Sequence, residues 1–280
     1  MSEGFFTHDS VDLFYTVQGP ENGQPILLLH GWCADQTDWA FQIPFLLTLA
    51  LPSSQRFRVI AADLRGHGRS IASAKITEFD PITMTTDVAA LAQHLGVSAD
   101  NPAIVMGHSL AGAVVAELSA QHPELVKAQV LIDPAYYMTP PVMEELVEKF
   151  RQDPEASLQI ASTFWESAYT PETPAWLKMW HQLRGRGMEK RILIDSFTEL
   201  AEYLGQSGAE YLRSVKAKAK AMPRLVVVAS PESVAVERAA AFNETYDRIE
   251  VLEAGHFLHK VDPNGFNDIL ENWLGQRGYL

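Results

Sequence analysis

A serine and a histidine at distant points of this 280-residue chain have the neighbours expected of a nucleophile and its base. Ser109 stands in the run Gly107–Ala111, sequence GHSLA, between two apolar stretches. His256 follows a glycine shortly after an apolar run near the C-terminus, where packing gives no reason for an imidazole. A hydroxyl is a weak nucleophile that needs a base within hydrogen-bond reach. The pair therefore predicts nucleophilic attack on a carbonyl group.

The residues around Ser109 predict a nucleophile elbow, which is a tight turn between a strand and a helix. Positions two before and two after the serine must be small in such a turn, and the serine backbone is strained. Gly107 fits the first position, whereas Ala111 stands where a second glycine is typical and Gly112 comes one residue later. The alternative is an ordinary strand–helix turn in which serine caps the helix.

The carboxylate that would orient the imidazole has two candidates. Asp133 ends one apolar run, and Glu232 follows another. Either carboxylate could hold His256 in the required tautomer and stabilise its cation. We favour Asp133, although an aspartate before a proline is also a common turn former. His108 and His259 are weaker candidates for the base, because one lies inside the elbow and the other falls three residues too late.

Apolar runs alternate with segments of helical periodicity along most of the chain. Such runs are typical of strands buried on both faces of a parallel sheet, and their alternation with helices predicts a doubly wound α/β fold. The expected strands span residues 4–9, 11–17, 26–30, 57–63, 103–106, 128–132, 224–229 and 248–252, and the expected helices include 39–49, 234–242 and 263–274. Ligands of such sheets bind at the carboxyl ends of the strands, where His30, Ser109, Asp133 and His256 are expected.

The pattern changes over residues 139–222, which we interpret as a helical cap inserted after the sixth strand. No strand-like run occurs there, and proline and glycine interrupt the helical segments. The core then comprises residues 1–138 and 223–280. We expect Trp165 and Tyr136 to line an apolar or aromatic pocket under the cap, with packing inside the cap as the alternative.

Composition narrows the range of partners to a small-molecule substrate. The formal net charge of −13 argues against nucleic acid and anionic membrane surfaces as partners. The single cysteine, Cys33, excludes an internal disulfide and favours a reducing, cytoplasmic setting. The histidines are scattered, and the chain has no zinc-ligand spacing and no dinucleotide-binding or phosphate-binding glycine motif. We therefore expect neither a metal nor a cofactor.

Taken together, these motifs make the chain resemble the α/β-hydrolase superfamily over essentially its whole length. The resemblance implies the fold of that name and its chain order of serine, acid and histidine. It also implies a substrate-binding loop at His30 and Trp32, with backbone N–H groups of Trp32 and Leu110 as an oxyanion hole. The matching motifs are His30–Trp32, Asp63–Ser70, Gly107–Ala111 and Gly255–Phe257.

A narrower resemblance is to the cofactor-free quinolone dioxygenases, which share this fold, open a 3-hydroxy-4-quinolone ring with O2 and release carbon monoxide. In that group a His–Asp dyad abstracts a proton, and the elbow serine has a secondary role. The resemblance rests on Gly31–Cys33, Phe57–Ile60, Arg65–Gly68, the acidic residue after the sixth strand and Ser230-Pro231 where most hydrolases carry their acid.

Our leading prediction is a serine hydrolase that cleaves an ester, lactone or similar carbonyl bond of a small apolar or aromatic substrate. Ser109 would be the nucleophile, His256 the base and Asp133 the acid. One alternative is a cofactor-free dioxygenase, in which His256 and Asp133 deprotonate a heteroaromatic substrate that then reacts with O2. The other is a ligand sensor that uses the same pocket without catalysis.

Overall fold

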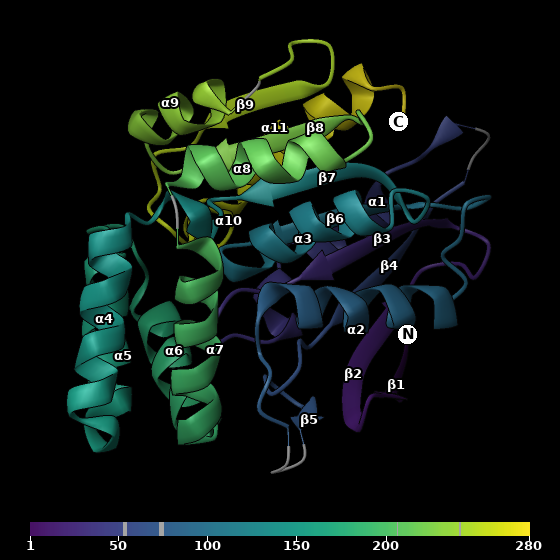
Figure 1. Ribbon diagram of the computed structural model, residues 1–280. Coiled ribbons are helices and arrows are strands. Elements are labelled where there is room, and N and C mark those ends of the chain that lie inside the picture. Colours follow the sequence, from purple (N-terminus) through teal and green to yellow (C-terminus); the bar gives the residue numbers. More distant parts are fainter. Residues whose placement is uncertain (53–54, 73–75, 206, 241) are drawn as a thin grey trace.

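One sheet in the order β1-β2-β4-β3-β6-β7-β8-β9 forms the middle layer of the computed structural model, which describes residues 1–52, 55–72, 76–205, 207–240 and 242–280 (Figure 1). Strand β2 runs antiparallel to β1, β4 and β5, and the other neighbouring pairs are parallel. The predicted doubly wound, mostly parallel sheet is thus confirmed, and the short β5 is an addition to the prediction. The strands are β1 (Ser2–His8), β2 (Val11–Gln18), β3 (Gln24–Leu29), β4 (Phe57–Ala62), β5 (Ile71–Ala72), β6 (Ala103–His108), β7 (Val126–Ile132), β8 (Arg224–Val228) and β9 (Asp247–Val251).

The central strands carry continuous apolar runs because helices cover both of their faces. Strand β6 lies between β3 and β7, and all of its residues are buried. Val105 packs into the apolar cluster on one face of the sheet, whereas Ile104 and Met106 pack into the cluster on the other face. Side chains of a strand alternate between faces, so one short apolar run supplies two cores.

Helices form the two outer layers of the core. On one face lie α2 (Pro81–His94), α3 (Leu110–Gln121) and α8 (Gly208–Lys218), and on the other lie α1 (Gln42–Thr48), α10 (Leu258–Val261) and α11 (Pro263–Gln276). Helix α9 (Pro231–Ala239) packs against α8, β8 and β9.

Two predicted helices are shifted in the structure. The helix expected at 39–49 is replaced by the 3-10 turn η1 (Gln36–Trp39) and α1, because the Asp35 carboxylate caps η1 by accepting the Thr37 N–H. The helix expected at 234–242 begins earlier, since Pro231 occupies the first turn of α9 and supplies the required φ.

A block of four helices stands beside the carboxyl ends of the parallel strands (Figure 1). It consists of α4 (Pro140–Gln152), α5 (Ser157–Ser167), α6 (Ala175–Gly187) and α7 (Lys190–Leu204), with short 3-10 turns η3 (Ala135–Tyr137) and η4 (Pro154–Ala156) before and within it. These four helices share an apolar cluster that includes Phe150, Leu177 and Phe197 and reaches the core at Trp32 and Phe257. We call this block the cap.

Helices α4–α7 and helix α8 all lie within the predicted insertion of residues 139–222. Helix α8 packs on α3 beside the sheet, and its Tyr211 also contacts Tyr203 of α7, with ring centroids 5.8 Å apart. The reason is its apolar stripe, Tyr211, Leu212 and Val215, which joins the apolar cluster of the core. The part of the insertion that stands over the strand ends is therefore α4–α7.

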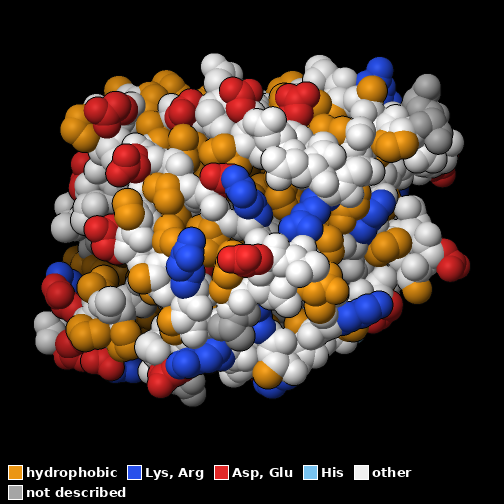
Figure 2. Space-filling model, turned by 90° about the horizontal axis from the view of Figure 1, so that it is seen from above, with side chains coloured by type: hydrophobic (Ala, Val, Ile, Leu, Met, Phe, Trp, Pro, Cys, Tyr) orange, Lys and Arg blue, Asp and Glu red, His pale blue; other side chains and the backbone are white. Residues whose placement is uncertain are grey.

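Figure 2 shows the face seen from above in Figure 1, and both signs of charge occur on it. Lysine and arginine side chains lie near aspartate and glutamate side chains, with apolar atoms between them. The negative net charge is thus not gathered on this face. Among the described residues, no helix is both long enough and apolar enough to cross a bilayer.

A buried ion pair fastens α9 to β8. Arg224 Nη2 donates to Glu237 Oε2 over 2.5 Å, and both side chains are almost fully buried. Tyr136 and Tyr137 donate their hydroxyl protons to Glu237 Oε1 over 2.9 and 2.6 Å. A second carboxylate, Asp247, lies 3.6 Å from Arg224 Nη1. The network therefore joins the segment after β7 to the far edge of the sheet.

Substitution Glu237→Ala should lower the free energy of unfolding by about 3 kcal/mol, because it leaves the buried Arg224 guanidinium without its closest counter-charge. Urea denaturation followed by far-UV circular dichroism measures this loss. The matched control is Glu145→Ala, which breaks the exposed pair with Lys149 and should leave the denaturation midpoint nearly unchanged. Equal midpoints for Glu237→Ala and the wild type would contradict the expectation.

Candidate active site

Three side chains from separate loops form a hydrogen-bonded chain at the carboxyl ends of the strands. Ser109 directly follows β6, Asp133 directly follows β7, and His256 lies in the loop between β9 and α10. His256 Nε2 is 2.9 Å from Ser109 Oγ, and His256 Nδ1 is 2.7 Å from Asp133 Oδ2. The other candidate acid, Glu232, is exposed in the first turn of α9. The geometry therefore joins Asp133, and not Glu232, to the imidazole.

The backbone around Ser109 has the geometry of an elbow. Ser109 has φ 53° and ψ −115°, a backbone conformation that residues other than glycine rarely adopt. A Cβ atom on Gly107 would lie 2.5 Å from the Ala111 carbonyl oxygen, and one on Gly112 would lie 2.3 Å from Pro134 Cβ. Ala111 is accommodated because the close approach of the following segment falls on Gly112 rather than on residue 111.

Backbone hydrogen bonds attach this elbow to the neighbouring strand. The Ser109 N–H donates to the Ile132 carbonyl over 3.0 Å, and the Ala135 N–H donates to the Ser109 carbonyl over 3.0 Å. Asp133 lies between these two partners in sequence and has φ 37°. The nucleophile and the acid are thus held at a fixed separation by main-chain contacts alone.

The histidine loop is held from two sides. Its turn uses Gly255 at φ 73°, where a Cβ atom would lie 2.6 Å from Thr170 Cγ2. His108 Nε2 and the His256 carbonyl oxygen are 2.9 Å apart, so the imidazole of the elbow donates to the backbone of the histidine loop. The Ala229 N–H donates to Asp133 Oδ1 over 3.1 Å, which leaves Oδ2 directed to the imidazole.

The model of the alpha/beta hydrolase family matches residues 26–269. The chain belongs to this family. It is 38% identical over 138 residues to a non-heme chloroperoxidase of Streptomyces lividans, which is 49% of this chain and 45% of that protein. It is 36% identical over 137 residues to the bifunctional esterase/perhydrolase DCH of Acinetobacter calcoaceticus, with shares of 49% and 45%. The matched part thus spans about half the length of these curated relatives.

The fold of this family member is also that of solved structures. Superposition on the enol-lactonase from Burkholderia xenovorans LB400 gives a TM-score of 0.77 at 20% sequence identity. The superposition covers 97% of this chain and 100% of that one. At this level of identity the likeness establishes the shared fold.

Aromatic side chains surround a pocket that opens at Ser109. The cavity volume of this pocket is about 20 Å³. The indole N–H of Trp32 donates to the Leu193 carbonyl and to Ser196 Oγ on α7, so this ring is attached to the cap. As expected from the sequence, Trp165 lines the pocket, at 3% exposure. The aromatic side chains of the wall are Trp32, Phe164, Trp165, Phe197 and Phe257.

Two residues whose side chains were expected to contact the substrate, His30 and Tyr136, do not line this pocket. His30 is fully buried, with Nε2 accepting the Leu64 N–H and Nδ1 donating to the Gly31 carbonyl. It therefore fixes the loop after β3 rather than contacting a substrate. Tyr136 is 1% exposed and donates to Glu237, away from the pocket. The expectation that these two side chains contact the substrate is corrected accordingly.

The predicted oxyanion-hole segments lie beside the nucleophile. Leu110 is the first residue of α3, so its N–H belongs to the helix N-terminus directly after Ser109. A Cβ atom on Gly31 would lie 3.1 Å from Ser109 Cβ, so the backbone that leads into Trp32 passes close to the serine.

A buried polar cluster that the sequence did not predict lies at the base of the pocket. Asp38 and His181 both line the pocket. Lys260 Nζ donates to Asp38 Oδ1 over 2.9 Å and to His181 Nε2 over 3.3 Å. Arg184 Nη1 donates to the same Asp38 oxygen over 2.6 Å, and its Nε donates to Asp35 over 3.0 Å. The only signal in the sequence is a set of charged residues on apolar segments, and nothing in their spacing links them.

The charges of this cluster shift one another's pKa values. Burial alone would raise the pKa of the Asp38 carboxyl, but the Lys260 ammonium and the Arg184 guanidinium hold it well below its usual range. Burial lowers the pKa of Lys260, and the Asp38 carboxylate opposes that shift. Burial and the Lys260 charge lower the pKa of His259 to about 3 and that of His181 to about 2. The imidazoles are therefore neutral near pH 7, whereas Asp38 is ionised.

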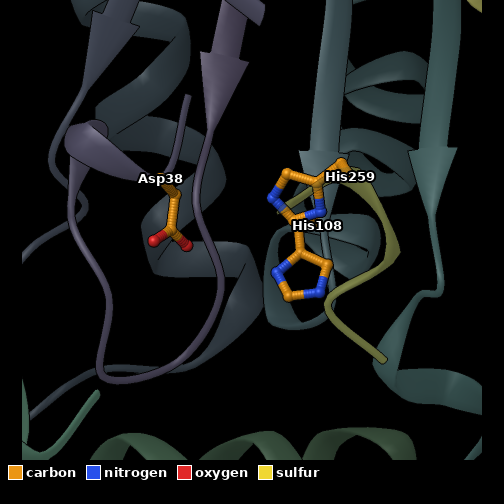
Figure 3. A group of neighbouring side chains, drawn as sticks. All are labelled: Asp38, His108 and His259. Carbon is orange, nitrogen blue, oxygen red and sulfur yellow. The ribbon is translucent and has the colours of Figure 1, made fainter. Parts of the chain in front are cut away.

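Asp38, His108 and His259 are the described residues that come nearest to a metal site. Their ligand atoms lie within 4.8 Å of one another, and Figure 3 shows the two imidazole rings close together with the carboxylate on a separate segment. Lys260 and Arg184 already neutralise Asp38 and Asp35 at this place. A divalent cation would add two uncompensated positive charges in a buried site, so the donor set fits a metal poorly.

Acid should destabilise the fold through its buried histidines. Burial, together with His30, lowers the pKa of His67 to about 3, whereas an unfolded imidazole titrates near pH 6.5. Below about pH 6.5 the unfolded chain binds a proton at this histidine, whereas the folded chain does not. The free energy of unfolding therefore falls as the pH drops from about 6.5 towards about 3. Each such histidine should lower the free energy of unfolding by about 2 kcal/mol between about pH 7 and about pH 5.

The variant His67→Gln isolates one of these contributions, because it removes a buried titrating ring far from Ser109 in sequence. Over this pH interval the free energy of unfolding, measured by urea denaturation, should fall by about 2 kcal/mol less in the variant than in the wild type. An identical loss in both proteins would show that His67 is protonated in the folded state.

Proposed function

We propose that the chain is a serine hydrolase that cleaves a carboxylic ester or lactone of a small, largely apolar and aromatic substrate. The observation that carries the proposal is the continuous hydrogen-bonded chain from Asp133 through His256 to Ser109, with distances of 2.7 and 2.9 Å. A serine in this arrangement has a base within reach for its proton and an acid that fixes the tautomer of the base.

In the acylation step, His256 Nε2 takes the Ser109 hydroxyl proton while Oγ attacks the carbonyl carbon. The negative charge that develops on the carbonyl oxygen is stabilised by the N–H groups of Trp32 and Leu110. His256 then gives its proton to the departing alkoxide, which leaves as an alcohol. Water attacks the acyl-enzyme by the same route, and the products are the carboxylic acid and free Ser109.

The substrate class follows from the walls of the pocket. Its lining is mainly apolar and includes five aromatic side chains, which suits an apolar or aromatic substrate. Relatives named as an esterase/perhydrolase and an enol-lactonase act on ester-type carbonyls, which supports the same reaction class for this chain. Family membership alone does not carry the activity, since one fold hosts many reactions.

Substitution Ser109→Ala should lower kcat/KM for 4-nitrophenyl esters by about 10⁴-fold or more, because it removes the nucleophile. His256→Ala should have a similar effect. Release of 4-nitrophenol from acetate, butyrate and phenylacetate esters measures both. A fluorophosphonate probe should label the wild type at residue 109 and leave Ser109→Ala unlabelled.

The competing reactions give distinct outcomes in the same proteins. Consumption of O2 and release of carbon monoxide from a 3-hydroxy-4-quinolone, retained in Ser109→Ala and lost in His256→Ala, would replace the hydrolase by a dioxygenase. Ligand binding without either activity would replace it by a sensor.

Substitution Asp133→Asn should lower kcat by about 10⁴-fold, and Glu232→Gln should leave it unchanged. The Ala229 N–H would keep the asparagine oxygen in place of Oδ1 and turn the amide NH2 group towards His256. His256 Nδ1 must then accept, so Nε2 carries the proton and faces Ser109 as a donor rather than a base. Steady-state kinetics over a range of pH measures the loss, and a large effect of Glu232→Gln instead would move the acid to α9.

A further inference from the structure

Two buried acceptor atoms at the base of the pocket, Asp38 Oδ2 and His108 Nδ1, lack a hydrogen-bond partner among the described residues. Both side chains line the pocket and are 1% exposed. His108 Nε2 donates to the His256 carbonyl, so a neutral ring carries its lone pair on Nδ1. Asp38 Oδ1 is occupied by Lys260 and Arg184, which leaves Oδ2 as the free acceptor.

These two acceptors belong to neighbouring side chains. One ligand atom of Asp38 and one of His108 lie within 4.8 Å of each other. A hydroxyl group carries a single proton, so it donates to one of the two acceptors. Most buried polar groups in proteins are paired, so two unpaired acceptors on a pocket wall indicate a molecule that supplies the donor. A Cβ atom on Gly31 would lie 2.9 Å from His108 Nδ1 and 3.1 Å from Ser109 Cβ, which places this acceptor close to the nucleophile.

Charge decides what kind of donor fits. Lys260 and Arg184 already balance Asp38 and Asp35, so a cation would leave an uncompensated buried charge. A neutral hydroxyl group adds no charge, and it also accepts a hydrogen bond. The ring nitrogens of His259 have no partner among the described residues, so this ring can supply that hydrogen bond.

The rest of the pocket determines which molecule carries the hydroxyl group. The aromatic rings of Trp32, Trp165 and Phe257 form an apolar wall above the acceptors, and they suit an aromatic ring by stacking or edge contacts. A phenol therefore suits the wall with its ring and one of the two acceptors with its hydroxyl proton.

We propose that Asp38 and His108 form a subsite that binds a hydroxyl group on the aromatic ring of the substrate. The subsite selects hydroxyaryl substrates over the same molecules without a donor. This inference rests on the proposed function only because it calls the bound molecule a substrate. The preference for a hydroxyl group concerns binding and can be measured without turnover.

The first test measures binding in Ser109→Ala, which holds the ligand without turnover. The probes are the three ethylphenol isomers, each compared with its methyl ether and with ethylbenzene, and the readout is the fluorescence of the tryptophans in the pocket wall. At least one ethylphenol should bind about tenfold or more tightly than both comparators. Equal affinities for all the probes would overturn the proposal.

The second test changes the free acceptor into a donor. In Asp38→Asn, Lys260 and Arg184 hold the amide oxygen at the position of Oδ1, so the NH2 group replaces Oδ2. The preference should then shift by about tenfold or more from the phenol towards its methyl ether, which offers only an acceptor. An unchanged phenol preference in this variant, with circular dichroism showing a folded protein, would overturn the subsite.

Arg184→Met is the matched control, because it breaks the same ion pair without changing Oδ2. It should lower the melting temperature and keep the phenol preference. Stoichiometric binding of Zn²⁺ that is lost in Asp38→Asn would assign the cluster to a metal instead. Esterase activity without a preference for phenols would contradict only the subsite. A preference for phenols without esterase activity would contradict only the proposed hydrolysis.

Discussion

The arrangement of the site depends on one strained turn. Ser109 adopts φ 53° because β6 ends and α3 begins with no residues to spare between them. Such backbone conformations cost about 1–3 kcal/mol, and they persist only where the surroundings over-determine them. Here the surroundings are β7, which accepts the Ser109 N–H, and the Ala135 N–H, which donates to the Ser109 carbonyl. The strain exposes the hydroxyl while leaving the rest of the helix in regular geometry.

The same turn places the other two members of the chain of hydrogen bonds. Asp133 follows the strand that holds the elbow, so the distance between acid and nucleophile is set by sheet register rather than by flexible side chains. His108, one residue before Ser109, donates to the backbone of the histidine loop. One segment of chain therefore contributes the nucleophile, a bond to the acid's strand and a bond to the base's loop, which is why its sequence is so constrained.

The elbow and the alternation of buried strands with helices were predictable because they depend on local rules. A tight turn permits only small residues beside the serine, and parallel strands buried on two faces require continuous apolar runs. Asp133 lies directly after β7, the strand next to β6, as the sequence predicts, and its role as the acid remains a prediction. Helix α8 was assigned to the cap because an amphipathic stripe does not specify which apolar surface it will cover.

The polar base of the pocket was not predictable, because Asp38, Arg184 and Lys260 come from three elements that meet only after folding. His30 and Tyr136 show the opposite error. Their positions next to the site motifs suggested contact with a substrate, but each has its polar atoms bound to the protein itself. Nearness in sequence to a catalytic motif indicates which loop a residue occupies, and the face that its side chain takes is decided by tertiary partners.

Burying charge under an apolar pocket is costly, so the Asp38 cluster calls for a physical reason. Replacing such a network by apolar residues is often neutral or stabilising, which means that stability alone does not explain it. The cluster does two things that an apolar base would not do. It ties α6 of the cap to the loop after β3 through Arg184, and it includes two pocket-lining acceptors that have no partner among the described residues. Each unpaired buried acceptor costs about 1–3 kcal/mol, a penalty that a bound donor removes and that an apolar competitor does not. Selectivity in this pocket thus arises from the acceptors that the protein places on its wall.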